Sequence, residues 1–135
     1  MSDWSGNVYV DTDVVLAVLK DDDWLASSGD IDALDDPKTS VATCIEVGYA
    51  MDGEWPRRRL TTVHEQLRDA GISLLPLRVE HLHAGMALRR TYDRLNQFDA
   101  IHLGVALTVE EPIVSTDTLY PTITEVEHVD PRDLS

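Results

Sequence analysis

The sequence alternates short apolar runs, rich in valine and isoleucine, with longer stretches of helical pattern. Buried strands are expected at 7–11, 72–77, 112–117 and 126–130, and another brief one near residue 38. Strands that alternate with helices pair in parallel within one sheet. The pattern therefore predicts an α/β fold in which helices pack on a mainly parallel sheet.

Helices are predicted between these strands, at 14–19, 24–36, from about residue 40 or 43 to 51, at 56–71, at 79–96 and at 98–109. Pro37 is expected to end the second helix. The helix at 56–71 has Pro56 in its first turn and Gly71 at its end, which is where these residue types usually occur in helices. The last helix is nearly all apolar, so it is expected to be central and buried.

Two predicted strands end in an aspartate, Asp11 and Asp117, and ligands of parallel sheets bind beyond the carboxyl ends of the strands. Glu46 and Asp99 also lie in apolar surroundings. Any one of these four carboxylates could be a helix cap or the partner of an arginine. All four together are harder to explain in this way, because no basic residue lies next to them in the sequence.

Four converging carboxylates repel one another, by roughly 3 kcal/mol for a pair about 5 Å apart at an effective dielectric constant near 20. Such a cluster takes up protons or binds a cation. Ligation by oxygen alone favours Mg²⁺ or Mn²⁺ over zinc. Divalent ions held by carboxylates suit phosphodiester hydrolysis, because they activate water and stabilise the leaving oxygen.

Four segments, "VYVDTDVVLAVL", "TSVATCIEVGYA", "NQFDAIHLGVAL" and "IVSTDTLY", together with the closing "VEHVDPRDL", resemble the PIN-domain family, particularly the small toxin ribonucleases of the VapC kind. The resemblance spans almost the whole chain and implies a single domain over residues 1–135. It also implies a three-layer α/β/α sandwich. The acidic tetrad of the family maps to Asp11, Glu46, Asp99 and Asp117.

By this resemblance, the tetrad is catalytic and binds Mg²⁺ or Mn²⁺, and the protein cleaves RNA to leave a 5′-phosphate and a 3′-hydroxyl. The resemblance also implies a small antitoxin partner and a homodimer. Thr12 and Thr116 are possible supporting residues or simple turn hydroxyls. Asp13 departs from the family pattern and either joins the metal shell or caps the following helix, which is the favoured interpretation. His102 is expected to be a satisfied histidine near the site.

Arginines supply most of the few positive charges. Arg57, Arg58 and Arg59 form one group and Arg89, Arg90 and Arg94 another, and these are candidate RNA contacts or partners of surface acids. The net charge of −14 with only two lysines suggests a surface adapted to high salt and hence a halophilic host. The rival interpretation is a protein that repels or mimics nucleic acid.

Other function classes fit less well. An apolar strand followed by two aspartates spaced like Asp11 and Asp13 also begins the sequence of HAD phosphatases. Both these phosphatases and receiver domains need a basic residue late in the chain, and Lys20 and Lys38 lie too early to supply it. A PIN fold used only for binding, or an RNA-processing nuclease without a toxin role, stays open. The apolar surroundings of Cys44, the absence of an apolar run long enough for a bilayer and the start of the chain favour a cytoplasmic protein without membrane attachment.

Overall fold

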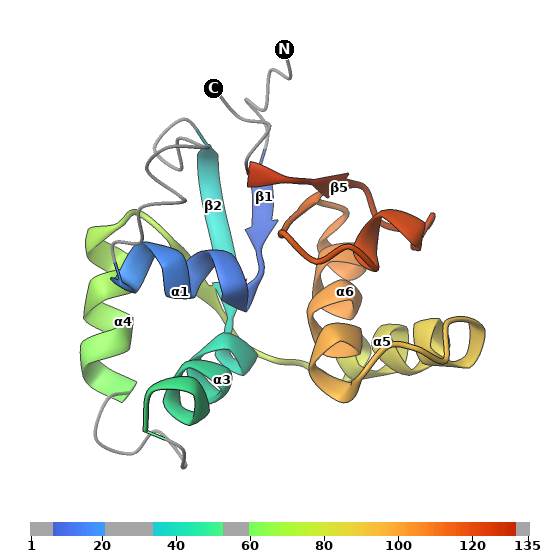
Figure 1. The fold of residues 1–135 in the computed structure, drawn as a ribbon, viewed down its shortest axis with the longest axis horizontal. Coiled ribbons are helices and arrows are strands. Elements are labelled where there is room, and N and C mark those ends of the chain that lie inside the picture. The colour runs from blue at the N-terminus through green and yellow to red at the C-terminus, as the bar shows by residue number, and fades with distance from the viewer. Residues whose placement is uncertain (1–6, 21–33, 53–59, 132–135) are drawn as a thin grey trace.

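Five parallel strands form the centre of the molecule. The computed structural model describes residues 7–20, 34–52 and 60–131. Within them the strand order is β3-β2-β1-β4-β5, and all four neighbouring pairs are parallel. Figure 1 shows β1 and β2 side by side. The strands are β1 (Asn7–Val10), β2 (Asp35–Ser40), β3 (Ser73–Leu75), β4 (Ile113–Val114) and β5 (His128–Val129).

Helices connect the strands and cover both faces of the sheet. They are α1 (Thr12–Lys20), α3 (Val41–Asp52), α4 (Leu60–Asp69), α5 (Val79–Thr91) and α6 (Gln97–Val109), with a 3₁₀ turn, η2 (Tyr120–Thr122), before β5. Among these, α6 is the most apolar, and six of its residues are buried. This confirms the prediction of a central, buried helix.

The alternation of side chains along β1 divides the core into two layers. Val8 and Val10 pack in a cluster with residues of α1, α3 and α4. Tyr9 points to the other face and packs with residues of α5, α6 and the segment around η2. A strand buried on both faces belongs to the middle layer of a sandwich. The predicted three-layer α/β/α architecture is thus confirmed.

The first part of the sheet differs from the expectation at Pro37. This residue was expected to end a helix over 24–36, most of which lies outside the described residues, but Pro37 belongs to β2. Proline removes a ladder hydrogen bond and is tolerated in sheets at irregular positions. The β1–β2 pairing is irregular here, and Asp36 has a positive φ of 44°. This local irregularity accommodates the proline.

Helix α5 also differs from the expectation. It ends at Thr91, five residues before the predicted end at 96. The apolar residues at helical spacing, Val79, Leu82 and Met86, are exposed, whereas the buried residues of α5 include Gly85 and Leu88. The contact between α5 and α6 is therefore formed by small residues of both helices, and not by the apolar stripe of Val79, Leu82 and Met86.

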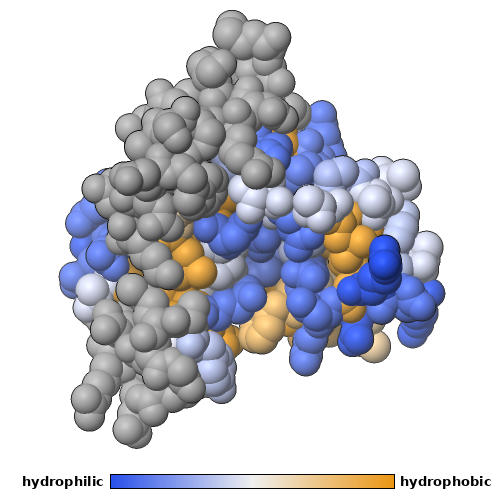
Figure 2. All heavy atoms as spheres, in the orientation of Figure 1, coloured by the Kyte–Doolittle hydropathy of each residue, from blue (hydrophilic) through white to orange (hydrophobic). Residues whose placement is uncertain are grey.

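Among the coloured residues in Figure 2, hydrophilic ones cover most of the visible surface, and hydrophobic ones show only in limited areas. None of the helices in the described part of the chain is long and apolar enough to cross a membrane.

Candidate active site

The acidic tetrad (Asp11, Glu46, Asp99 and Asp117) comes from four elements that meet beyond the carboxyl ends of the central strands. Asp11 directly follows β1, and Asp117 lies three residues after β4. Glu46 lies in the middle of α3, and Asp99 lies in the first turn of α6. The position of the site follows from the parallel sheet, in which β1 and β4 are neighbours.

The buried carboxylate of Asp11 has one polar neighbour on each side. Its Oδ2 accepts a hydrogen bond from Ser115 Oγ at 3.0 Å. Its Oδ1 lies 3.7 Å from His102 Nε2. Burial raises the pKa of Asp11 to about 7, against the opposing effect of the His102 charge, and the charge of Asp13 raises it further. A carboxyl in this state is ready to hold either a proton or a cation.

Glu46 is tied to the same histidine. Its Oε1 accepts a hydrogen bond from Thr12 Oγ1 at 2.6 Å and lies 2.5 Å from His102 Nε2. Burial opposes the charged imidazole, but the hydrogen bond to Glu46 and the charges of Asp11 and Glu46 raise the pKa of His102 above its ordinary value. His102 therefore joins two members of the tetrad.

Asp99 and Asp117 lie on the other side of the site. Asp99 Oδ1 accepts a hydrogen bond from Tyr120 Oη at 3.0 Å, and Asp117 Oδ1 accepts one from the Leu119 amide at 2.8 Å. Burial raises the pKa of Asp99, and the charges of Asp117 and Glu46 raise it further. Repulsion thus links Asp99 with Asp117 and Glu46.

Asp13 does not cap α1, contrary to the favoured interpretation. It lies in the first turn of the helix, but its Oδ2 accepts hydrogen bonds from the Thr116 amide, at 3.0 Å, and from the Thr116 hydroxyl. Asp13 therefore ties the start of α1 to the segment that carries Asp117. The two threonines are also placed by the structure, since Thr12 bonds Glu46 and Thr116 bonds Asp13.

The tetrad has the right donors for Mg²⁺ or Mn²⁺, because carboxylate oxygens are what these ions prefer. Burial, with a smaller contribution from neighbouring carboxylates, raises the pKa of Asp11 and of Asp99, and a bound cation would offset both effects. Within residues 7–20, 34–52 and 60–131, no three His, Cys, Asp or Glu side chains are already arranged to hold a metal ion. Glu46 and Asp99 each engage one carboxylate oxygen, Oε1 of Glu46 with His102 Nε2 and Oδ1 of Asp99 with Tyr120 Oη.

The candidate RNA contacts are only partly visible. Arg90 and Arg94 are exposed, at the end of α5 and in the turn before α6. Arg89, beside them, donates from Nε to the Leu95 carbonyl at 3.2 Å. Arg57, Arg58 and Arg59 lie outside the described residues.

Sequence reasoning missed the hydroxyl groups that support the acids. Tyr120 bonds Asp99, and Tyr9 lies 2.6 Å from His102 Nδ1 through its hydroxyl. Thr43 Oγ1 lies 3.2 Å from Thr12 Oγ1. Tyr9 and Tyr120 lie two and three residues from predicted acids in the sequence, but nothing in the pattern indicates that their hydroxyl groups have a polar role.

Comparisons with known proteins agree on the family and fold. Residues 8–125 match the PIN domain. A toxin–antitoxin complex from Klebsiella pneumoniae aligns with a TM-score of 0.68 at 18% identity, covering 92% of this chain and 97% of that one. VapBC-1 from nontypeable Haemophilus influenzae aligns with a TM-score of 0.70 at 13% identity, covering 93% and 98%. No curated protein sequence matches.

Proposed function

Because the chain belongs to the PIN-domain family, we propose that it is an endoribonuclease that hydrolyses RNA phosphodiester bonds with Mg²⁺ or Mn²⁺. One observation carries this proposal: Asp11 and Asp117 follow the neighbouring strands β1 and β4, His102 Nε2 contacts both Asp11 and Glu46, and the charges of Asp117 and Glu46 act on Asp99. Such a site is suited to a cation and a phosphate, not to an uncharged ligand.

In this proposal all four acids of the tetrad hold the metal, and the bound ion supplies water activation and stabilisation of the leaving oxygen. The protein orients the acids beforehand. Ser115 holds Asp11, Tyr120 holds Asp99, and Thr12 holds Glu46. Asp13 acts through Thr116 by fixing the turn that leads to Asp117. Arg90, Arg94 and the run at 57–59 are proposed to bind RNA phosphates.

We further propose that the protein is the toxin of a type II toxin–antitoxin pair. The similar structures include a DNA-bound VapBC from Salmonella typhimurium, with a TM-score of 0.68 at 14% identity. A small antitoxin with a basic side chain would be attracted to the uncompensated acids of the tetrad. A reading frame for such a protein directly upstream would separate a toxin from an RNA-processing nuclease, since catalysis itself would be the same.

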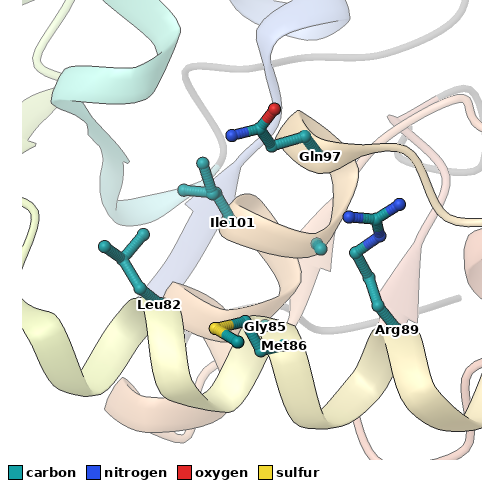
Figure 3. A pocket seen from close by; sticks show the side chains of 7 residues that line it. Leu82, Gly85, Met86, Arg89, Gln97 and Ile101 are labelled. Carbon is teal, nitrogen blue, oxygen red and sulfur yellow. The ribbon is translucent and has the colours of Figure 1, made fainter.

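A homodimer is proposed as the assembly state. Val79, Leu82 and Met86 give α5 an exposed apolar stripe. Leu82, Met86 and Ile101 line a groove of about 390 Å³ between α5 and α6 (Figure 3). A second copy of this helix pair would cover the stripe and the groove together.

The test incubates the purified protein with total RNA at high KCl, in Mg²⁺, Mn²⁺ or EDTA. We expect cleavage with either ion, none in EDTA, and products with 5′-phosphate ends. Asp11→Asn and Asp99→Asn should each lower the rate by about two orders of magnitude or more. Asp93→Asn, an exposed acid outside the tetrad, serves as the matched control.

Two outcomes would contradict this assignment. Cleavage that survives both Asp11→Asn and Asp99→Asn would place catalysis elsewhere. The absence of cleavage under every condition would favour a PIN fold that only binds.

A further inference from the structure

A buried chain of hydrogen bonds runs behind the acidic tetrad. It joins Tyr9 of β1, Ser40 at the end of β2 and His102 of α6, and all three residues are at most 1% exposed. None of these side chains belongs to the tetrad. The chain therefore connects the core of the α5–α6 layer to the site through side-chain bonds alone.

The direction of these bonds fixes the histidine ring. Tyr9 Oη donates its single proton to Ser40 Oγ at 2.8 Å. The phenolic oxygen must then accept the hydrogen bond from His102 Nδ1, which lies 2.6 Å away. The ring is thus anchored on one side by a buried tyrosine that cannot move without disturbing β1.

The other ring nitrogen faces the acids. His102 Nε2 lies 2.5 Å from Glu46 Oε1, 3.0 Å from Thr12 Oγ1 and 3.7 Å from Asp11 Oδ1. Glu46 is partly exposed on α3, so its long side chain has several rotamers to choose from. The anchored ring contacts the Glu46 carboxylate with the same nitrogen that faces Asp11.

His81 provides a contrast within the same layer. It is also buried, but its Nδ1 accepts a hydrogen bond from the Arg78 amide and so serves the start of α5. A histidine that is only structural needs no more than this. The second nitrogen of His102, by comparison, is directed at two members of the tetrad.

We propose that His102 is a positioning residue, which Tyr9 and Ser40 hold in place and which sets the carboxylate of Glu46 against Asp11 before a divalent ion binds. The inference rests on the proposed function only in that the tetrad holds a cation. It makes no use of the RNA substrate. The ring acts through Glu46 and contacts neither metal nor substrate in this role.

The test measures Mn²⁺ affinity by electron paramagnetic resonance on folded protein, for wild type and the variants His102→Leu, His102→Gln and Tyr9→Phe. Loss of a hydrogen bond to a ligating carboxylate weakens metal binding by about 10- to 100-fold, which is expected for His102→Leu. His102→Gln should recover part of this loss, because its amide can still donate to Glu46. Tyr9→Phe removes a single oxygen and should weaken binding by a smaller factor.

His81→Leu is the matched control, which should lower stability without changing Mn²⁺ affinity. A proton signal from His102 Nδ1 in the nuclear magnetic resonance spectrum of metal-free protein should disappear in Tyr9→Phe, which checks the anchor independently of metal. If His102→Leu does not fold, Tyr9→Phe carries the comparison.

The outcomes separate the two proposals. Unchanged Mn²⁺ affinity in folded His102→Leu or, failing that, in Tyr9→Phe overturns the positioning role, whether or not RNA is cleaved. Wild-type protein that binds Mn²⁺ but cleaves no RNA overturns the nuclease and leaves the positioning role standing. Wild-type protein that binds no Mn²⁺ overturns both.

Discussion

Among the single residues, Asp11 shows most clearly how a group proposed to bind a metal ion can lower the stability of the fold. Its pKa is raised from 3.8 to about 7, chiefly by burial. A carboxyl whose pKa is raised in the folded state contributes its full stability at pH values below about 4, and this contribution is lost as the pH rises through about 7. The charged carboxylate of Asp11 therefore lowers the free energy of unfolding above about pH 7, unless a bound cation neutralises it.

Asp11→Asn should stabilise the metal-free protein at high pH. Between the ordinary and the raised pKa of Asp11, each tenfold change in proton concentration changes the free energy of unfolding by about 1.4 kcal/mol. The free energy of unfolding of wild type should therefore fall, relative to the variant, by on the order of 3 kcal/mol between pH 5 and pH 8. Urea unfolding in EDTA measures this difference. Equal pH dependence in the two proteins would refute the burial argument, and Asp93→Asn controls for loss of a surface charge.

The acids of the site could be named from the sequence, and so could Thr12, Thr116 and His102 near them, but the bonds that join these residues to the tyrosines and to Ser40 could not. Asp11 and Asp117 stand out because each follows an apolar strand. Tyr9 meets Ser40 and His102 across 31 and 93 residues of chain, and such pairings depend on the strand order, which no local pattern contains. The structure brings the charges of the tetrad together, while their roles in catalysis and metal binding stay predictions.

Among the secondary-structure elements, α5 and α6 pack so closely that their contact leaves no space for a side chain at Gly85 or Gly104. A Cβ atom on Gly104 would lie 2.7 Å from the Gly85 amide nitrogen and closer still to the His81 carbonyl. A Cβ atom on Gly85 would lie 2.5 Å from the Ala100 carbonyl. The backbones of the two helices thus touch without side chains between them.

Gly104→Ala should push the two helices apart and destabilise the protein by about 1–3 kcal/mol, as overpacking does. Since α6 also carries Asp99 and His102, the proposed nuclease activity should fall as well. Gly71→Ala is the control, because Gly71 has a φ of 78° but no atom within 4 Å, so its cost comes from the backbone alone. Thermal unfolding measures both, and an unaffected Gly104→Ala would show that the contact is looser than described.

The exposed stripe on α5 makes the assembly state testable. If a second copy covers it, Met86→Glu should give a monomer in light scattering under conditions where wild type is a dimer. Thr91→Glu, which adds the same charge to the exposed end of α5, should stay dimeric. Monomeric wild type at all concentrations would contradict the homodimer.

Elements with strong local patterns agreed with the prediction, and those set by packing did not. The strands before Asp11 and Asp117 and the helix α6 were found where the apolar runs placed them. The end of α5 at Thr91, before the predicted residue 96, was not evident from the sequence, and neither was the contact with α6 through Gly85 and Gly104. Pro37 was misread because the irregular β1–β2 pairing that accommodates it leaves no trace in the sequence.

Charge dominates at the scale of the whole molecule. A net charge of −14 on 135 residues creates self-repulsion, which ions screen over about 8 Å at physiological salt and about 3 Å at 1 M. We propose on this basis that the protein is adapted to high salt. This proposal concerns the working conditions of the molecule and is independent of its fold.

The unfolding temperature should therefore rise between 0.1 and 2 M KCl, by several degrees or more. NaCl should act similarly, because screening depends on ionic strength. Sulfate is avoided, since it stabilises most proteins by exclusion from their surface. An unfolding temperature that does not rise with either chloride would rule out the salt adaptation.

The strand order has a consequence for synthesis of the chain on the ribosome. β1 pairs with β4, so Tyr9 can take its place in the sheet only after Ile113 has been synthesised. In the same way, Asp11 can form its hydrogen bond only after Ser115 has been synthesised. Contacts so distant along the chain form late in folding. A nascent chain that has not yet emerged past Asp117 has an incomplete sheet and an incomplete tetrad. The proposed nuclease would thus be inactive in any product that ends before Asp117.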